Sequence, residues 1–303
     1  MASKAAPEIH VPHDIAARTL AGLLRDILAS GRKPIESPDI SDADAVHDLR
    51  KALKGWRAML RLMTPTVGDE AELMRVRARD LAREIATARD CQAAQEALAD
   101  LGDDGVAKLP AGSRAAISER LDALRADAEA VSLTPDRKAR IRQMWADADA
   151  AIERWPIERF ARTEAARRLT TSYRQVRAAF PEDWAKASPD ALHKLRQRVV
   201  EYRYQMEIAE PVWPKVMRLV VSEAQRLRDR LGTHHDLAIL QHLTGSDQPL
   251  ARWRPQLAPL IVARQTTHAM AAKRLAGRLF VEKPKAFLKR LTLLWEHCAE
   301  DRG

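Results

Sequence analysis

The feature that most constrains the fold of this chain is an internal repeat. Sliding the sequence by 146 residues without a gap places His47 on His193 and Arg50 on Arg196. Further identities follow at the same offset: Arg57/Arg203, Pro65/Pro211, Leu73/Leu219, Leu81/Leu227, Thr87/Thr233, Asp90/Asp236 and Gln95/Gln241. The repeat is far longer than the 20 to 50 residues of solenoid units. It therefore predicts two similar halves related by a pseudo-twofold axis.

The sequence predicts helices in both halves. The chain is rich in Ala, Leu and Arg and has only 5% aromatic residues, a composition that favours helices over sheets. No strand pattern competes. Asp14 is a candidate helix cap, and the first helix is expected to stop at Gly31. The predicted helices cover 13–30, 45–63, 69–99, 113–130, 135–155, 164–180, 189–209, 213–243, 250–280 and 284–299.

The predicted fold class is all-α, with two helical bundles built from a duplicated helical repeat. We expect a single domain over 1–303, in which 10–160 form the first repeat and 161–303 the second.

One predicted helix carries an unusual charge pattern. In "AVHDLRKALKGWRAMLRLM", residues 45–63, six basic side chains fall within a stripe roughly 120° wide, and the apolar residues point the other way. Like charges one turn apart cost a few tenths of a kcal/mol per pair, so an ordinary solvated face mixes signs. The stripe indicates either such a solvated face or a surface that meets an anion. It consists of His47, Arg50, Lys51, Lys54, Arg57 and Arg61.

The composition restricts the classes of binding partner and the cellular compartment. The net charge is +9, which favours nucleic acid, a membrane surface or another polyanion. Two cysteines imply no disulfide framework and fit a reducing compartment. Neither a secretory signal nor an apolar run of about 18 residues is visible, so the sequence predicts a cytoplasmic protein without a membrane partner. No phosphate loop, nucleophile motif or zinc spacing appears, and we expect no metal and no cofactor.

The segments "VHDLRKALKGWRAMLRLM" and "LHKLRQRVVEYRYQMEI", each followed by a long helix, resemble the two halves of a CHAD domain, the conserved histidine α-helical domain. The resemblance implies two helical bundles with internal pseudo-symmetry. It also implies that the protein binds inorganic polyphosphate, is not an enzyme, and resides in the cytoplasm at polyphosphate granules, with granule proteins as further partners.

The same resemblance assigns binding residues beyond the stripe. The second basic helix departs from the pattern, because Val200 and Glu207 stand where the first half has Lys54 and Arg61. We therefore expect the first half to contribute more to binding. The added candidates are His193, Arg196, Arg198 and Arg203 on the second basic helix, Arg75, Arg79 and Arg83 on 69–99, and Arg168, Arg174 and Arg177 on 164–180.

Three alternatives remain. "GTHHDLAIL" contains His234, His235 and Asp236, which could ligate a metal in a phosphohydrolase. The repeat disfavours this, since the first half preserves only the aspartate. Nucleic-acid binding would use aromatic stacking on Trp56, Tyr202 and Tyr204, but these lie on the apolar side or its edge. A helical scaffold for an acidic protein is the third.

Overall fold

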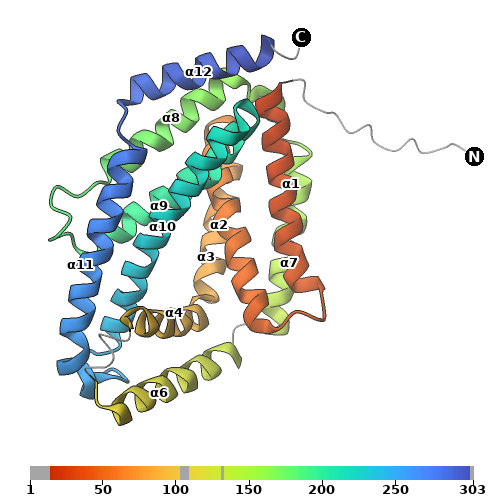
Figure 1. Cartoon of the computed structure of the whole chain (residues 1–303). Helices are drawn as coiled ribbons and strands as arrows, with labels where there is room; N and C mark the ends of the chain where they lie inside the picture. Colours follow the sequence, from red (N-terminus) through yellow and green to blue (C-terminus); the bar gives the residue numbers. More distant parts are fainter. Residues whose placement is uncertain (1–13, 103–108, 131–132, 301–303) are drawn as a thin grey trace, which may run out of the picture.

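A computed structural model shows the architecture and describes residues 14–102, 109–130 and 133–300 (Figure 1). Residues 10–13 of the predicted first repeat lie outside this part of the chain. The residues that are described form helices and no β-strand, which confirms the all-α prediction. The α-helices are α1 Ile15–Glu36, α2 Asp42–Val67, α3 Asp69–Glu84, α4 Ala86–Asp100, α6 Ala111–Ala130, α7 Pro135–Ile152, α8 Arg162–Ala178, α9 Pro189–Met206, α10 Pro214–His242, α11 Arg254–Leu279 and α12 Pro284–Glu300, and the short 3₁₀ helices are η1 Ile157–Arg159, η2 Glu207–Val212 and η3 Ala251–Trp253.

Helix α1 begins as expected but ends later. The Asp14 side chain accepts a hydrogen bond from the Ala16 N–H at 2.8 Å and caps the helix. The predicted stop at Gly31 is wrong, because α1 continues to Glu36. A Cβ atom on Gly31 would lie 2.4 Å from Trp145 of α7. This glycine therefore serves a close helix contact rather than a helix end.

The predicted helix 69–99 is broken in two. Ile85 leaves the helical conformation at φ −104°, ψ 18° and separates α3 from α4. The Arg50 guanidinium donates hydrogen bonds to the carbonyl oxygens of Ala82 at 3.1 Å and Ile85 at 3.5 Å, which satisfies acceptors that a helix end leaves without partners. The break turns α4 away from α3 and lets it pack against α10 and α6 (Figure 1).

The helix order of the first half recurs in the second. α1 packs against α2 and α7, and α8 packs likewise against α9 and α12. α4 contacts α6 as α10 contacts α11, and α2 meets α9 where the halves join. The rotation that relates the halves stays a prediction, but the order of contacts is repeated.

The two halves share their hydrophobic cores. The larger cluster contains Trp56 of α2, whose ring stacks on Trp155 at 6.0 Å, together with buried residues of α8, α9 and α12. The smaller cluster joins Ala94 of α4 and Ile117 of α6 to Leu240 of α10 and Ile261 of α11. Because each cluster draws on both halves, neither half buries its apolar surface alone.

Matching caps start the two central helices. Ser41 accepts a hydrogen bond from the Asp44 N–H, and Ser188 accepts one from the Ala191 N–H, each at 3.2 Å. The caps begin α2 and α9 within one residue of equivalent points of the repeat, so the His-x-x-Arg motif lies near the start of both helices. Within the described residues, no helix combines the length and the apolar composition needed to cross a bilayer.

Candidate anion-binding site

Two adjoining cavities lie between α2 and α9. The first, of about 550 Å³, is closed by residues of α10 and α4, and we call it the α10 cavity. The second, of about 470 Å³, is closed by α3, and we call it the α3 cavity. Arg50, Lys54, Arg196 and Val200 line both. We refer to the two cavities together as the basic channel.

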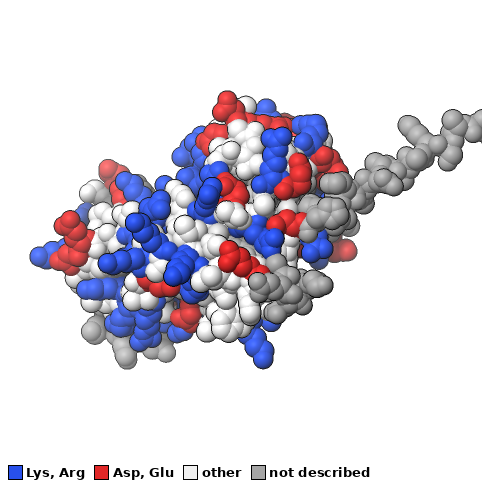
Figure 2. Space-filling model, turned by 90° about the horizontal axis from the view of Figure 1, so that it is seen from above, with Lys and Arg blue, Asp and Glu red and all other residues white. Residues whose placement is uncertain are grey.

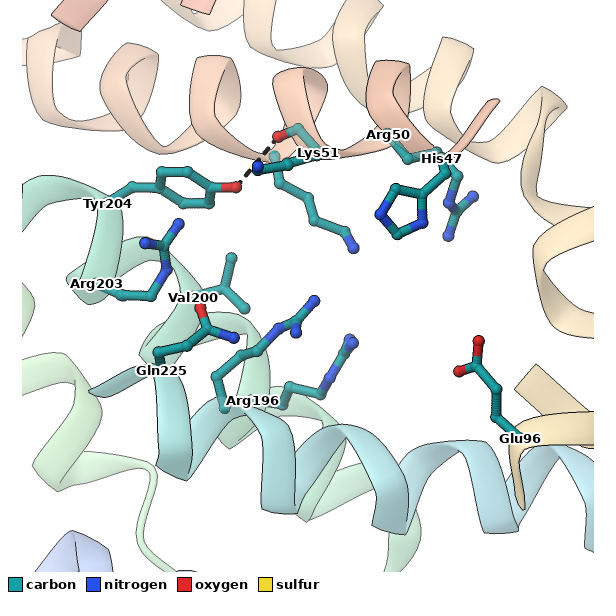
Figure 3. A pocket seen from close by; sticks show the side chains of 11 residues that line it. His47, Arg50, Lys51, Glu96, Arg196, Val200, Arg203, Tyr204 and Gln225 are labelled. Atoms are coloured by element: carbon teal, nitrogen blue, oxygen red, sulfur yellow. Dashed lines mark hydrogen bonds between the residues drawn. The ribbon is translucent and has the colours of Figure 1, made fainter. Parts of the chain in front are cut away.

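The α10 cavity brings basic side chains of both halves face to face. Figure 3 shows His47, Arg50 and Lys51 of α2 across from Arg196 and Arg203 of α9. Lys54 of α2 and Arg228 of α10 complete the basic lining. Glu96 of α4 is the one carboxylate among the described residues that line this cavity.

The α3 cavity gathers the arginines of α2 and α3. Its described lining includes Arg57 and Arg61 from α2 and Arg75, Arg79 and Arg83 from α3. This is the set that the stripe and the spacing on 69–99 predicted. The α3 arginines have acidic neighbours on their own helix, with the Arg75 Nε 2.8 Å from Glu72 and the Arg79 Nε 2.9 Å from Asp80.

Arg57 is a half-buried cation of the channel. Its Nε is buried and has no hydrogen-bond partner within the described part of the chain. Burial lowers the pKa of the Arg57 guanidinium below its ordinary value, and the neighbouring cations Arg75, Arg61 and Arg79 lower it further, while Glu201 opposes them. A half-buried cation among other cations favours an anion beside it.

The two repeat-equivalent histidines have different surroundings. The exposed His47 lines the α10 cavity. His193 lines the α3 cavity, where its Nδ1 lies 3.1 Å from the Nδ1 of His235 and its Nε2 lies 2.8 Å from the amide nitrogen of Gln197. Burial lowers the pKa of His193, and Arg196 lowers it further. His193 therefore favours its neutral form, and a bound anion would oppose that preference.

The structure does not bring four of the predicted residues to the channel lining. Arg168 pairs with Glu164, and Arg198 pairs with Glu201 at 3.0 Å. Arg177 donates to the carbonyl oxygens of Phe280 and Glu282 and so holds the segment between α11 and α12. The remaining one is the exposed Arg174 of α8. Helix α8 packs against α9 and α12 rather than over the cavities, so its three arginines lie outside the basic channel.

Sequence reasoning missed Arg228. It lies on α10, lines the α10 cavity and contacts Asp229 at 2.7 Å. Its repeat equivalent is Ala82, so the duplication carries no signal for it. The surrounding "RLRDR" mixes signs and reads as a solvated face, and only the packing of α10 on α9 reveals its position.

The aromatic residues that could stack on bases are mostly inaccessible. Trp56 is 0% exposed and Tyr202 is 1% exposed, both within the larger core. The ring of Tyr204 is covered by the Arg203 guanidinium at 3.9 Å, and its hydroxyl donates to the Lys51 carbonyl oxygen at 3.2 Å. This arrangement gives little support to stacking on nucleic-acid bases.

The two candidate histidine ligands have different surroundings. His234 is buried, whereas its neighbour His235 bonds to His193. No group of three or more His, Cys, Asp or Glu side chains with metal-binding geometry occurs within the ranges that the structure describes. Burial lowers the pKa of His234 to about 4, and the nearby His268 contributes to the shift.

This lowered pKa predicts an acid-sensitive fold. The unfolded chain binds more protons than the folded one below pH 6.5, so the stability contribution of a neutral His234 is complete above that pH and is lost as the pH falls toward 4. His234→Leu should reduce the loss of unfolding free energy between pH 7 and pH 5 by about 2 kcal/mol. Urea unfolding at both pH values measures this. His47→Gln, which removes an exposed histidine, should keep the full loss, and an equal loss in His234→Leu and the parent would contradict the prediction.

The sequence model of the CHAD domain matches residues 18–245, which is most of the chain. The chain therefore belongs to the CHAD domain family, as its resemblance predicted. The match includes the whole of α2, α4, α9 and α10, the helices that form the α10 cavity.

Solved structures share the fold. The crystal structure of the CHAD domain from the plant Ricinus communis aligns with a TM-score of 0.63 and 17% sequence identity, covering 91% of this chain and 94% of that one. PptA from Streptomyces chartreusis aligns with a TM-score of 0.60 and 18% identity, covering 88% and 99%. At these identities the likeness establishes the fold alone. No curated protein sequence matches this chain.

Proposed function

We propose that this protein binds inorganic polyphosphate in the basic channel. The observation that carries the proposal is the convergence of cations from both halves on two adjoining cavities, each with a single carboxylate among its described lining residues. Arg50, Lys54 and Arg196 line both cavities and would contact a chain that passes from one to the other.

The chemistry of the channel suits a polymer of phosphates. Polyphosphate carries about one negative charge per phosphate and presents no bases to be read, so a binder requires a track of cations. Arginine can hold phosphate oxygens in a bidentate manner, and lysine acts as a point charge. Release of condensed counterions would drive association, as it does for nucleic-acid backbones. Membership of the CHAD family supports this ligand, following the resemblance described above.

The proposal is one of binding without catalysis. The channel residues are cations suited to holding phosphate oxygens, and the buried His234 and the His193–His235 pair serve contacts within the protein. We further propose that the protein acts in the cytoplasm at polyphosphate granules, where a cationic track would hold it to the polymer.

A salt series with the full chain tests the proposed ligand. The logarithm of the association constant for long-chain polyphosphate should fall linearly with the logarithm of salt concentration, with a slope of several units because each phosphate contact contributes roughly 0.7. Unlabelled polyphosphate should displace a bound fluorescent polyphosphate probe far better than single-stranded DNA at equal phosphate concentration. An acidic peptide should hardly compete.

Each contrary outcome has a definite meaning. A salt-independent affinity would rule out an electrostatic track. Equal displacement by DNA would indicate a general polyanion binder, and displacement by the peptide would favour the scaffold for an acidic protein.

A further inference from the structure

One carboxylate lies inside the α3 cavity. Glu201 of α9 is the only acidic residue among the described residues that line this cavity, and its side chain is 18% exposed. It faces an otherwise basic lining of Arg50, Lys54, Arg57, Arg61, Arg75, Arg79, Arg83 and Arg196.

Both oxygens of Glu201 are engaged by arginines. Oε1 lies 3.0 Å from the Nε of Arg61 on α2, and Oε2 lies 3.0 Å from a terminal nitrogen of Arg198 on its own helix. Burial lowers the pKa of Arg57, and the charge of Glu201 opposes this shift. The pKa of Arg75 on α3 is raised mainly by its hydrogen bond to Glu72, and Glu201 adds to that rise. The carboxylate thus takes positions that the oxygens of a phosphate group would otherwise occupy.

We propose that Glu201 is an internal counter-anion that competes with phosphate in the channel and makes binding depend on ligand length. This inference rests on the proposed function. It assigns a specificity role to the carboxylate that directly follows Val200 on the second basic helix.

The length dependence follows from tethering. A carboxylate held on α9 acts at a high effective concentration, so a short phosphate must displace it to reach Arg61. A short ligand makes few other contacts that offset this cost. A long chain also contacts cations of the α10 cavity, which Glu201 does not touch, and so loses a smaller fraction of its binding free energy.

Glu201 should also stabilise the ligand-free protein. Without it, Arg57, Arg61 and Arg75 would repel one another with less compensation. Glu201→Gln should therefore lower the melting temperature of the free protein. Saturating polyphosphate should reduce the difference from the parent, because the ligand supplies the missing negative charge.

The test compares Glu201→Gln with a matched control. Glu223→Gln removes the same charge and one ion pair, to Arg226 at 2.7 Å, from α10 outside both cavities. Dissociation constants for tripolyphosphate and for long-chain polyphosphate are measured at one fixed salt concentration. We expect Glu201→Gln to bind tripolyphosphate about tenfold more tightly and long chains less than about threefold more tightly. Glu223→Gln should match the parent with both ligands.

The possible results distinguish a failure of the counter-anion role of Glu201 from a failure of the proposed polyphosphate binding. If the parent binds neither ligand, the proposed function fails. If the parent binds and a folded Glu201→Gln variant shows unchanged or weaker affinity for tripolyphosphate, the counter-anion role is wrong. If circular dichroism shows that Glu201→Gln does not fold, Glu201→Asp replaces it. Its shorter side chain draws the charge away from Arg61, so it should change the affinities in the same direction by a smaller factor, and parent-like affinities would again overturn the proposal.

Discussion

Replacing Arg57, Arg75 and Arg79 together with alanine is expected to weaken the binding of long-chain polyphosphate on the order of a hundredfold near 0.1 M salt. These three arginines line the α3 cavity from two helices. If each neutralises one phosphate, the slope of the salt dependence should fall by about 2, since a contact on a single strand contributes roughly 0.7. Titrations at several salt concentrations measure both the affinity and the slope.

The fold should survive this substitution. Alanine is a strong helix former, and removing like charges relieves repulsion in the free protein. Arg50 is left in place because its hydrogen bonds to the carbonyl oxygens of Ala82 and Ile85 hold the end of α3. Circular dichroism should show parent-like helicity.

A matched control distinguishes binding in the channel from attraction to the net positive charge of the protein. Basic side chains also occupy the outer surface, and blue Lys and Arg side chains cover much of the face seen in Figure 2. Lys273, Arg274 and Arg278 lie exposed on α11 and line neither cavity. Their triple alanine variant loses the same charge and should bind within about threefold of the parent. If both triple variants lose affinity equally, the ligand is held by net charge and the channel is not its site.

The second large effect concerns stability. Gly31→Ala should destabilise the protein by about 2 kcal/mol, although alanine is the better helix former by about 1 kcal/mol. The added Cβ would lie 2.4 Å from Cζ2 and 2.5 Å from Cε2 of the Trp145 ring, which is 0% exposed and has no room to retreat. Relief therefore requires separating α1 from α7.

Gly22→Ala in the same helix should act in the opposite direction. A Cβ atom at Gly22 meets nothing within 4 Å, so only the helix propensity changes, and stability should rise by about 0.5 to 1 kcal/mol. Urea unfolding of both variants measures the two signs. A stabilising Gly31→Ala would show that α1 and α7 are less closely packed than the structure has them.

Local sequence patterns predicted the helices well. The apolar spacing in "VHDLRKALKGWRAMLRLM" correctly indicated α2, and the helical pattern of the second basic segment indicated α9. The candidate cap Asp14 correctly marked the start of α1. Helical periodicity and capping arise from interactions within a few residues, so a single sequence contains them. The repeat added the relation between the two basic helices, which no local pattern supplies.

The predictions that failed depend on contacts between distant residues. Gly31 reads as a helix end, yet it lies inside α1 because Trp145 packs on it from α7. The break at Ile85 has no Gly or Pro to mark it, and it follows from the packing of α4 on α10 and from the bond donated by Arg50.

The residues of the candidate site also fall into those that local spacing predicted and those that only tertiary packing placed. Residue types and helical spacing predicted a basic face with Arg50, Arg57 and Arg61, because one helix suffices to define a face. Which other cations meet that face depended on how the helices pack. Packing brought Arg75 and Arg228 to the channel and left Arg177 bound to carbonyl oxygens beside α12.

By itself the sequence determined the all-α class, the duplicated order of helices and the charge of the central helix faces, since each depends on residue spacing along the chain. Only the tertiary structure decided that α2 and α9 enclose two cavities and that Glu201 lies inside one of them against Arg61. In the sequence, Glu201 simply follows Val200, and no local pattern predicts its contact with Arg61 of α2. That contact exists only once the two halves have packed on their shared cores.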